Sequence, residues 1–386
     1  MHRDLLRTAL LVTASGMTGW IGWSGHVLLL PTAAAFPGFW SLARTRWQAL
    51  AVSAAYFLSA SRGLPQGVAN FYGSEIWPGI LLWAIASTAF VALHAMLWAD
   101  HDGLGRCLRY MILLIATALP PFGITGWAHP ITAAGVLFAA WGWCGLVAMA
   151  AALGVMTTRH RAFAAIAMIG MWIWSAANWT TPKLPSSWEG VDLHLGASLG
   201  RDLSLQRQEE LIDIVRGYRP ASTIVLPESA LGFWTPTVAQ LWHITLVGTG
   251  ITVIAGAAVI DETGYDNVLV KISPEGNEVL YRERMPVPGS MWQPWRGGTG
   301  QDGGARAHFF ANPVVPVGDV MIAPLICYEM IVVWPILQSV FNRPDAIVAV
   351  GNGWWTTGTS IIGIQAASIE AWARLFDLPL VISFNS

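Results

Sequence analysis

Charged side chains are scarce in this sequence. They make up 11% of its 386 residues, whereas a soluble globular chain usually carries about 25%. A disordered chain is excluded, because disordered segments are rich in charge and poor in aromatic residues, and this chain has 22 tryptophans. The formal net charge of −2 leaves no basic surplus that would indicate binding to nucleic acid. The composition instead predicts a protein that spends much of its length in a membrane.

The few charges are unevenly distributed. Residues 1–180 contain nine arginines, no lysine and four acidic residues, whereas residues 181–386 contain 12 basic and 19 acidic residues. We therefore expect a polytopic transmembrane domain at 1–180 and a water-soluble domain at 188–386. A transmembrane helix needs about 20 apolar residues. Seven apolar runs of the first half are interpreted as membrane spans, at residues 6–23, 25–42, 47–61, 77–98, 107–126, 131–156 and 162–179.

The arginines of the first half predict an orientation for these spans. With the N-terminus inside the cell, eight arginines fall in inside segments and only Arg62 falls outside, in agreement with the positive-inside rule. Seven spans in the inner membrane then place the C-terminal domain outside, which is the periplasm in a Gram-negative bacterium. A signal peptide cleaved near residues 33–35 is a less favoured alternative, because the apolar run is too long and further spans follow.

The second half has the periodicity of an α/β fold. Amphipathic stretches predict helices at 204–216 and 362–376. Polar groups lie at the ends of three elements, namely Glu228, the segment 281–288 and Cys327, and α/β folds place their sites at such positions. Short apolar runs predict the strands, at residues 191–195, 223–226, 251–260, 267–272, 278–282, 320–326, 346–350 and 380–384.

Cysteine is also scarce. Cys107 and Cys144 lie in the first half and only Cys327 lies in the second, so the second half has no partner for an internal disulfide. A lone thiol is a liability in an oxidising compartment, which makes Cys327 a candidate for chemistry. The plainer interpretation is a small buried side chain that only packs. A nearby carboxyl whose pKa is raised by burial, such as Glu228, would serve as the base that activates the thiol.

Three motifs of the second half resemble those of the nitrilase, or carbon–nitrogen hydrolase, superfamily. They are Val-Leu-Pro-Glu-Ser at 225–229, Tyr-Arg-Glu-Arg-Met-Pro-Val-Pro at 281–288 and Ile-Cys-Tyr-Glu at 326–329. The resemblance covers residues 190–386, with Val-Gly-Asn-Gly-Trp-Trp at 350–355 as a further feature, and it implies an αββα sandwich with a Glu–Lys–Cys catalytic set. Together with the spans, the whole chain resembles the apolipoprotein N-acyltransferases and a group of conjugal transfer proteins of similar architecture.

The resemblance implies a role for several residues. Glu228 would be the general base, and Cys327 would be the nucleophile that forms a thioester. The backbone N–H of Tyr328 would line the oxyanion hole, and Glu329 matches the second glutamate beside the nucleophile. No metal or other cofactor is implied.

The catalytic lysine of the family is absent. Alignment on the Val-Pro pair at 287–288 places Glu283 at its position. Arg282 or Arg284 would supply a positive charge there, but an arginine cannot shuttle a proton. An acid in place of a cation should also raise the pKa of Glu228. The alternative is that these charged residues form only the edge of a hairpin. The chain has two lysines, Lys183 and Lys271, and neither fits the motif.

Other features of the second half are weaker signals. Gly-Thr-Gly-Gln-Asp-Gly at 298–303 matches a dinucleotide-binding pattern, but it neither follows a strand nor opens a helix. A flexible loop, or a mobile lid near the membrane surface, is the better interpretation. Trp354 and Trp355 are either interfacial residues or the walls of an acyl-chain pocket. Three histidines lack the spacing of metal ligands: His194, His243 and His308.

Two functions follow as expectations. The first is acyl transfer or amide hydrolysis on a membrane lipid or lipid-linked substrate through a thioester at Cys327, in the setting of plasmid conjugation that the resemblance implies. The second is a catalytically degenerate protein that is a structural or binding component of the conjugal transfer machinery. The missing lysine is the feature that discriminates between them.

Overall fold

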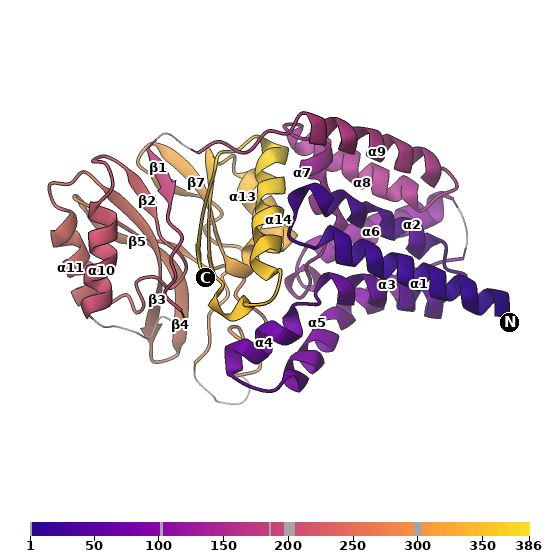
Figure 1. Ribbon diagram of the computed structural model, residues 1–386, viewed down its shortest axis with the longest axis horizontal. Helices are drawn as coiled ribbons and strands as arrows, with labels where there is room; N and C mark the ends of the chain where they lie inside the picture. Colours follow the sequence, from indigo (N-terminus) through magenta and orange to yellow (C-terminus); the bar gives the residue numbers. More distant parts are fainter. Residues whose placement is uncertain (1, 101–102, 185–186, 197–204, 297–302) are drawn as a thin grey trace. The chain divides into compact units, whose positions relative to one another are not determined.

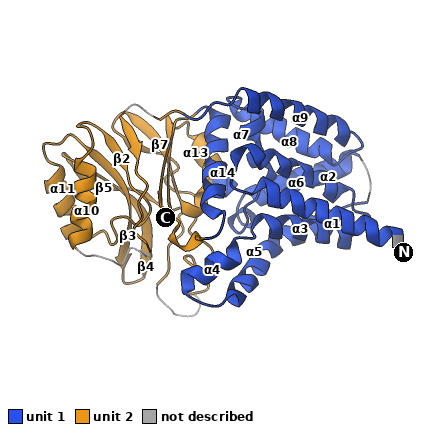
Figure 2. Ribbon diagram, viewed as in Figure 1, with its two compact units in different colours: residues 1–182, 331–334, 358–377 blue, residues 183–330, 335–357, 378–386 orange. Residues whose placement is uncertain are grey.

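The computed structural model describes residues 2–100, 103–184, 187–196, 205–296 and 303–386. The chain forms two compact units (Figure 2). Unit 1 consists of Met1–Pro182, Ile331–Trp334 and Gly358–Asp377, and unit 2 consists of Lys183–Met330, Pro335–Thr357 and Leu378–Ser386. The second half of the chain therefore contributes residues to both units.

Unit 1 is built from helices (Figure 1). The helix α14 (Ile361–Phe376) joins it from the far end of the chain. Three 3₁₀ helices lie among the α-helices: η1 (Val27–Ala35), η2 (Phe122–Ile124) and η3 (Pro130–Ala133). The remaining α-helices are α1 (His2–Gly22), α2 (Phe36–Ser41), α3 (Arg46–Ala60), α4 (Leu64–Tyr72), α5 (Ile76–Leu97), α6 (Leu104–Ala118), α7 (Ala134–Leu137), α8 (Gly142–Met156) and α9 (Arg161–Ala177).

The expectation of a multi-pass membrane domain at 1–180 is wrong. Among the described residues, α5 is the one helix that is long and apolar enough to cross a membrane, as judged by its length of 22 residues and its composition. The predicted span at 25–42 is a 3₁₀ helix that contains Pro31, followed by the six-residue α2. The predicted span at 131–156 is divided among η3, α7 and the 15-residue α8. An apolar run is not a continuous helix where proline or a turn interrupts the backbone hydrogen bonds, and a crossing needs about 20 helical residues.

The helix α14 is held within unit 1 by Arg374. Its guanidinium donates hydrogen bonds to the backbone oxygens of Thr180 and Gly135, at 2.9 and 3.2 Å, and lies 3.4 Å from the ring centroid of Trp179. Gly135 lies so close to α14 that a Cβ there would come within 1.6 Å of the Ala371 carbonyl oxygen. These contacts explain why a helix more than 180 residues downstream belongs with the helices of the first half.

Unit 2 contains two β-sheets. In the five-stranded sheet, with the order β1-β2-β3-β4-β5, the first three strands are parallel and the last two are antiparallel. In the four-stranded sheet, with the order β6-β7-β8-β9, the last three strands are parallel. The strands are β1 (Trp188–Gly190), β2 (Thr223–Val225), β3 (Thr252–Asp261), β4 (Gly264–Ser273), β5 (Gly276–Arg282), β6 (Val315–Val317), β7 (Val320–Ile326), β8 (Ala346–Asn352) and β9 (Leu380–Asn385).

One apolar core lies between the two sheets. Val225, Ile254, Leu269 and Tyr281 of the five-stranded sheet share it with residues of the four-stranded sheet. Because side chains alternate along a strand, the odd-numbered residues of β4 near Leu269 point toward the other sheet. The four-stranded sheet contributes Val315, Val317, Ile322, Ile326, Ala346, Val348, Val350 and Val381.

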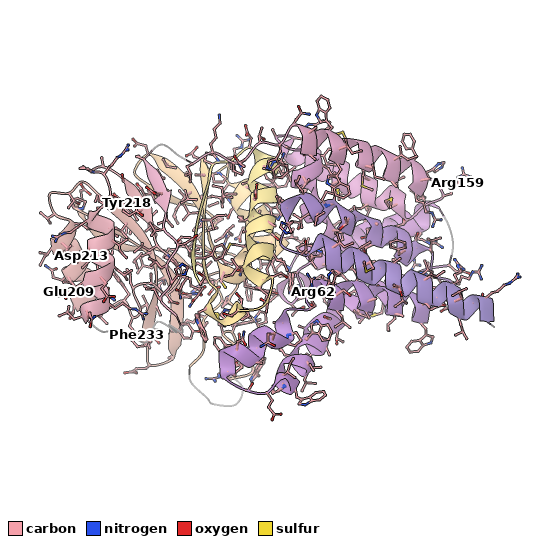
Figure 3. The ribbon with its side chains drawn as sticks, viewed as in Figure 1. Arg62, Arg159, Glu209, Asp213, Tyr218 and Phe233 are labelled. Atoms are coloured by element: carbon pink, nitrogen blue, oxygen red, sulfur yellow. The ribbon has the colours of Figure 1, made fainter. Side chains whose placement is uncertain are left out.

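Two helices cover the other face of the five-stranded sheet, α10 (Leu205–Arg216) and α11 (Pro236–Leu246). Leu211 and Val215 of α10 are buried against the sheet, whereas Glu209 and Asp213 lie on the exposed side of the helix (Figure 3). Unit 2 therefore has the helix–sheet–sheet layers of a nitrilase-like sandwich. Its other helical elements are η4 (Cys327–Met330), η5 (Trp354–Thr356) and α13 (Val333–Phe341) from Pro335 onward.

Candidate active site

Glu228 lies on a sharp turn that follows β2. Leu226 still donates its N–H to the Ile254 oxygen of β3, at 2.8 Å, and the chain then turns at Ser229, which has a φ of 61°. The neighbouring strand approaches this turn very closely. A Cβ at Gly256 would lie 2.4 Å from the Glu228 Cα, so that only glycine permits the approach. The turn leaves the Glu228 side chain 5% exposed.

Cys327 begins a second sharp turn, directly after β7. Its φ is 48°, a left-handed conformation that is uncommon for residues other than glycine. The side chain is 6% exposed. The turn is fastened by Glu329, whose Oε2 accepts a hydrogen bond from the Ile326 N–H at 2.8 Å. A strained position of this kind persists only where its surroundings determine it, and such positions are frequent at active sites.

The structure brings Glu228 and Cys327 together. Burial raises the pKa of the Glu228 carboxyl to about 7, an effect that the Asn267 amide, the nearby Cys327 thiol and the Asn352 backbone partly offset, while the charge of Glu329 adds to it. Neither the thiol nor the Asn352 backbone makes a hydrogen bond of normal geometry to Oε2, which is buried without a partner among the described residues. A carboxyl with a pKa near neutrality is well matched to accept a proton from a thiol.

Asn267 joins Glu228 to Glu283. Its Nδ2 donates to Glu228 Oε1 at 2.8 Å and to Glu283 Oε2 at 3.0 Å. Asn267 lies on β4 with the parity of Leu269, so its side chain points toward the second sheet. The sequence analysis missed this residue. Its signal was a polar side chain at an inward position of a strand whose following residues, 268–270, are apolar.

Glu283 is the residue at the position of the family's lysine, and it is 1% exposed. Its backbone N–H donates to the Asn267 oxygen at 2.9 Å, which extends the pairing of β4 and β5 by one residue. Burial raises the pKa of its carboxyl well above the usual range, and the charges of Glu329 and Glu228 raise it further. Glu283 follows directly on β5, at the end of the hairpin, and its side chain is buried from solvent.

Glu329 is surrounded by hydrogen-bond donors. The Tyr281 hydroxyl lies 2.7 Å from both of its oxygens, and the N–H groups of Arg284 and Met285 donate to Oε1 at 2.8 and 3.1 Å. With the bond from Ile326 N–H, these contacts tie the Cys327 turn to the segment that follows β5. Glu329 therefore positions the nucleophile rather than facing it.

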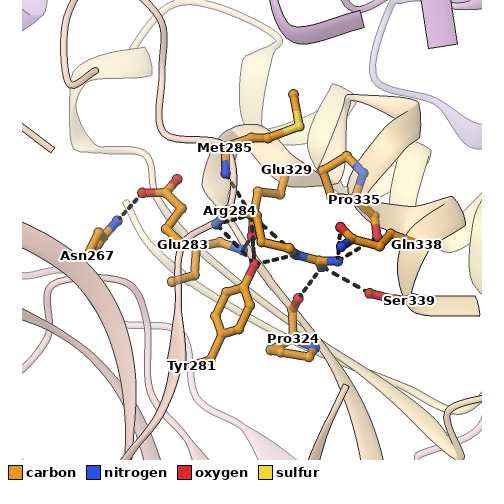
Figure 4. Close-up of polar contacts among 11 residues, drawn as sticks. Asn267, Tyr281, Glu283, Arg284, Met285, Pro324, Glu329, Pro335, Gln338 and Ser339 are labelled. Carbon is orange, nitrogen blue, oxygen red and sulfur yellow. Dashed lines mark hydrogen bonds and ion pairs between the residues drawn. The ribbon is translucent and has the colours of Figure 1, made fainter. Parts of the chain in front are cut away.

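Arg284 points away from Glu283 (Figure 4). Its fully buried guanidinium donates to the Tyr281 hydroxyl, to side chains of α13 and to two backbone oxygens. Arg282 instead pairs with Asp266. Neither arginine takes the place of the family's lysine beside Glu228. The other acceptors of Arg284 are Pro324 O at 3.2 Å, Pro335 O at 3.0 Å, Gln338 Oε1 at 3.1 Å and Ser339 Oγ at 2.9 Å.

The remaining residues singled out in the sequence lie apart from this cluster or have other partners. Tyr328 is buried next to Cys327, and Trp355 donates its indole N–H to the Asn352 oxygen at 2.8 Å. Within the described ranges, no three His, Cys, Asp or Glu side chains are grouped in a way that could hold a metal ion. Residues 298–302 of the glycine-rich loop lie outside the described residues. Each of the three histidines has a polar partner: His194 contacts Ser386, His243 contacts Ser273, and His308 contacts Asp266.

Comparison with known proteins identifies the family of the chain. The carbon–nitrogen hydrolase family model matches residues 58–374. A probable conjugal transfer protein TraB of Sinorhizobium fredii is 61% identical over the full length of both chains. The conjugal transfer protein TraB of Agrobacterium fabrum is 57% identical, over all of this chain and 94% of that protein.

The extent of the family match bears on the architecture. It spans residues from α3 to α14 and so includes much of unit 1, rather than beginning at residue 188. The family match therefore extends across the predicted boundary between the helical half and the second half of the chain. Among solved structures, an amidase of the nitrilase superfamily from Nesterenkonia is 12% identical, with a TM-score of 0.38 over 52% of this chain and 78% of that one.

Proposed function

The chain belongs to the carbon–nitrogen hydrolase family, and from that premise we propose that Cys327 carries an acyl group as a thioester. The observation that supports this most directly is the pairing of a thiol on a strained turn with a buried carboxyl whose pKa is about 7. The reaction is acyl transfer to an amine or hydrolysis of an amide. Both pass through the thioester, with different acyl donors and acceptors.

The proposed chemistry needs one base and one nucleophile. Ionised Glu228 takes the thiol proton, and Cys327 Sγ attacks the carbonyl carbon while the carbonyl π electrons move to oxygen. The backbone N–H of Tyr328 is proposed as a donor to this oxyanion. Collapse expels the leaving group, which takes the proton from Glu228 and leaves the thioester. The acceptor then gives a proton to Glu228 and attacks the thioester, and the departing thiolate takes that proton back.

A second candidate function is a catalytically degenerate component of the conjugal transfer machinery. The observation that favours it is the missing cation, since Arg284 and Arg282 are both engaged elsewhere. Glu283 occupies the lysine position as a buried acid. In this alternative the pair of Glu228 and Cys327 persists as part of the fold without turnover.

The biological setting is proposed to be plasmid conjugation at the inner membrane, with a lipid-linked acyl group as the substrate. Two relatives that carry the name conjugal transfer protein match the full chain at 57% and 61% identity. Large apolar side chains are exposed on the helices of unit 1, and patches of this kind mark contacts with lipid or protein. Examples are Leu81 and Ile85 of α5 and Ile166 and Ile173 of α9, with exposures of 62%, 60%, 70% and 65%.

Transfer of a labelled acyl chain tests the proposal. The purified full-length protein in detergent is incubated with a phospholipid that carries a fluorescent acyl chain. We expect a protein-bound label that hydroxylamine releases, and we expect Cys327→Ala to lose it. The exposed Cys144 provides the matched control, because Cys144→Ala should label normally. Equal labelling of the wild-type protein and Cys327→Ala would contradict the thioester.

The same variant separates the two candidate functions in the cell. In a donor strain whose conjugation depends on this gene, Cys327→Ala should lower plasmid transfer to the level of a deletion if the thioester is required. Normal transfer by Cys327→Ala, at normal protein levels, would instead establish the degenerate component.

A further inference from the structure

Glu283 has one oxygen with a partner and one without. Oε2 accepts the hydrogen bond from Asn267 Nδ2 at 3.0 Å. Oε1 is buried and has no hydrogen-bond partner among the described residues. Native proteins pair nearly all buried polar groups, and those left over are frequent at functional sites. The unpaired oxygen belongs to a side chain that is 1% exposed, so water does not supply the missing partner freely.

Two carboxyl groups share a single amide donor at this site. Both hydrogens of Asn267 Nδ2 are used, one for Glu228 and one for Glu283. A third carboxyl, Glu329, lies close enough for its charge to affect both of them. Two buried carboxylates without a cation between them do not both ionise, because each charge is desolvated and repels the other.

Glu283 is the member of the pair that keeps the proton. The pKa of its carboxyl is raised well above the usual range, whereas that of Glu228 is raised to about 7. Glu228 also has the Cys327 thiol and the Asn352 backbone near it, which favour its charged form. At neutral pH the pair therefore consists of a titrating base, Glu228, and a neutral acid, Glu283.

The hydrogen bond from Asn267 decides which oxygen of Glu283 carries that proton. Oε2 already accepts from Nδ2, so the hydroxyl hydrogen belongs on Oε1. The neutral side chain is therefore a buried O–H donor whose acceptor is missing among the described residues. A substrate with a carbonyl oxygen would supply that acceptor.

We propose that Glu283, as a neutral acid, contacts the substrate and donates a hydrogen bond from Oε1 to the carbonyl oxygen of the acyl group. This inference rests on the proposed function, because it needs an acyl substrate at Cys327. As Sγ bonds to the carbonyl carbon, the π electrons move to this oxygen, and the hydrogen bond from Glu283 strengthens. Glu283 keeps its proton throughout, and Glu228 alone carries the proton between the thiol, the leaving group and the acceptor.

Two probes of Cys327 separate this role from a purely structural one. Acylation by p-nitrophenyl acetate passes through an oxyanion and releases p-nitrophenolate. Methyl methanethiosulfonate has no carbonyl group: the thiolate attacks its sulfur, forms a mixed disulfide and expels methanesulfinate. Both rates are measured on the full-length protein, and mass spectrometry of the peptide that contains Cys327 distinguishes it from Cys107 and Cys144.

The two variants of Glu283 differ in whether the new side chain can donate a hydrogen bond. Glu283→Gln keeps a neutral N–H donor at nearly the same place, since its amide oxygen accepts from Asn267. It should acylate within about threefold of the wild-type rate, whereas Glu283→Ala should acylate about 100-fold more slowly, as expected for loss of one oxyanion donor. Both variants should react with methyl methanethiosulfonate within about threefold of the wild type. Glu278→Gln is the control, because Glu278 is an exposed acid of β5 paired with Lys271.

Three results would overturn the inference. Acylation of Glu283→Ala at the wild-type rate would show that no donor was lost. Equal slowing of both reactions in Glu283→Ala would assign Glu283 a structural role. Acylation of Glu283→Gln as slow as that of Glu283→Ala would show that a neutral donor is not what matters. The proposed function fails in a different way, by equal acylation of the wild-type protein and Cys327→Ala.

Discussion

Two neighbouring residues, Glu283 and Arg284, face opposite sides of one strand end and have opposite surroundings. Arg284 and its partner Glu329 use nearly all of their hydrogen-bonding capacity, with contacts to Tyr281, Met285 and the residues of α13 (Figure 4). On the other side, Glu283 and Glu228 share the one amide of Asn267. Each of these two acids keeps one buried oxygen without a partner in the described part of the chain.

This difference separates the charged groups that stabilise the fold, Arg284 and Glu329, from those that remain available for chemistry, Glu228 and Glu283. A buried ion pair whose groups are all hydrogen-bonded is costly to break and chemically inert. A buried acid with too few donors holds or exchanges a proton near neutral pH. The hydrogen bonds around Glu329 fix the Cys327 turn. This rigidity allows Glu228 and Glu283 each to keep a buried oxygen without a hydrogen-bond partner among the described residues.

Removal of Arg284 should have the largest effect on stability. Arg284→Met leaves several buried acceptors without donors, and breaking a buried ion pair in this way costs about 3–5 kcal/mol. Urea unfolding, followed by tryptophan fluorescence, measures the change. Arg306→Met is the control, because this arginine is 31% exposed and its partner Asp261 is 54% exposed. Its other partner, the buried Asp266, keeps Arg282 and His308, so the loss should be less than about 1 kcal/mol. Equal losses of stability in the two variants would contradict the structural role assigned to the hydrogen bonds of Arg284.

Glu283→Gln should change the pH dependence of stability by a smaller amount. The ordinary pKa of a glutamate is 4.5, and that of Glu283 is raised in the folded protein, so the unfolded chain releases its proton first. The wild-type protein therefore loses stability as the pH rises above the unfolded pKa. The variant lacks this loss and should gain stability relative to the wild type as the pH rises from about 5 to 8.

The measurement is thermal or urea unfolding at both pH values. Glu278→Gln serves again as the control, since this residue is exposed and should show no such gain. A wild-type protein that becomes more stable over this pH interval than Glu283→Gln would mean that Glu283 is ionised in the folded state.

Of the three changes, removal of the Asn267 amide should have the smallest effect, and this effect is on the pKa of Glu228. The Asn267 hydrogen bond lowers the pKa of Glu228, so Asn267→Ala should raise it above its present value of about 7. The lower limb of the pH–rate profile for Cys327 and methyl methanethiosulfonate should then move upward by about one pH unit. The exposed Asn342 provides the control, Asn342→Ala, and a shift toward lower pH would contradict the bridging role of Asn267.

Local sequence signals predicted most strands of unit 2, but the predicted strand at 191–195 was wrong, and β1 and β6 were missed. The strands at 320–326, 380–384, 267–272 and 278–282 have close counterparts in β7, β9, β4 and β5. These elements depend on side-chain alternation and on turn residues, both of which can be read over a few positions. Asn267 was missed because its importance depends on Glu228, 39 residues earlier in the chain, and no short pattern records that pairing.

The helical half was predicted less well. Its apolar runs were correctly recognised as apolar, but their division into seven spans was wrong. Helix length depends on where turns such as the one around Pro31 interrupt the backbone hydrogen bonds. The helix α14 was predicted close to its observed bounds, whereas its association with the first half depends on Arg374 and on the close approach at Gly135.

The reactive groups of the site can be read from the amino-acid sequence: one cysteine after a strand, one glutamate after another, and an acid at the position where the family keeps a lysine. It also determined the scarcity of charge, with only two lysines in the chain, neither of which fits that position. How these charges are compensated becomes visible only in the folded protein. Burial, a shared amide and the separation of Glu283 from Arg284 depend on side chains that meet across two sheets, and the protonation of an acid depends on all of its neighbours at once.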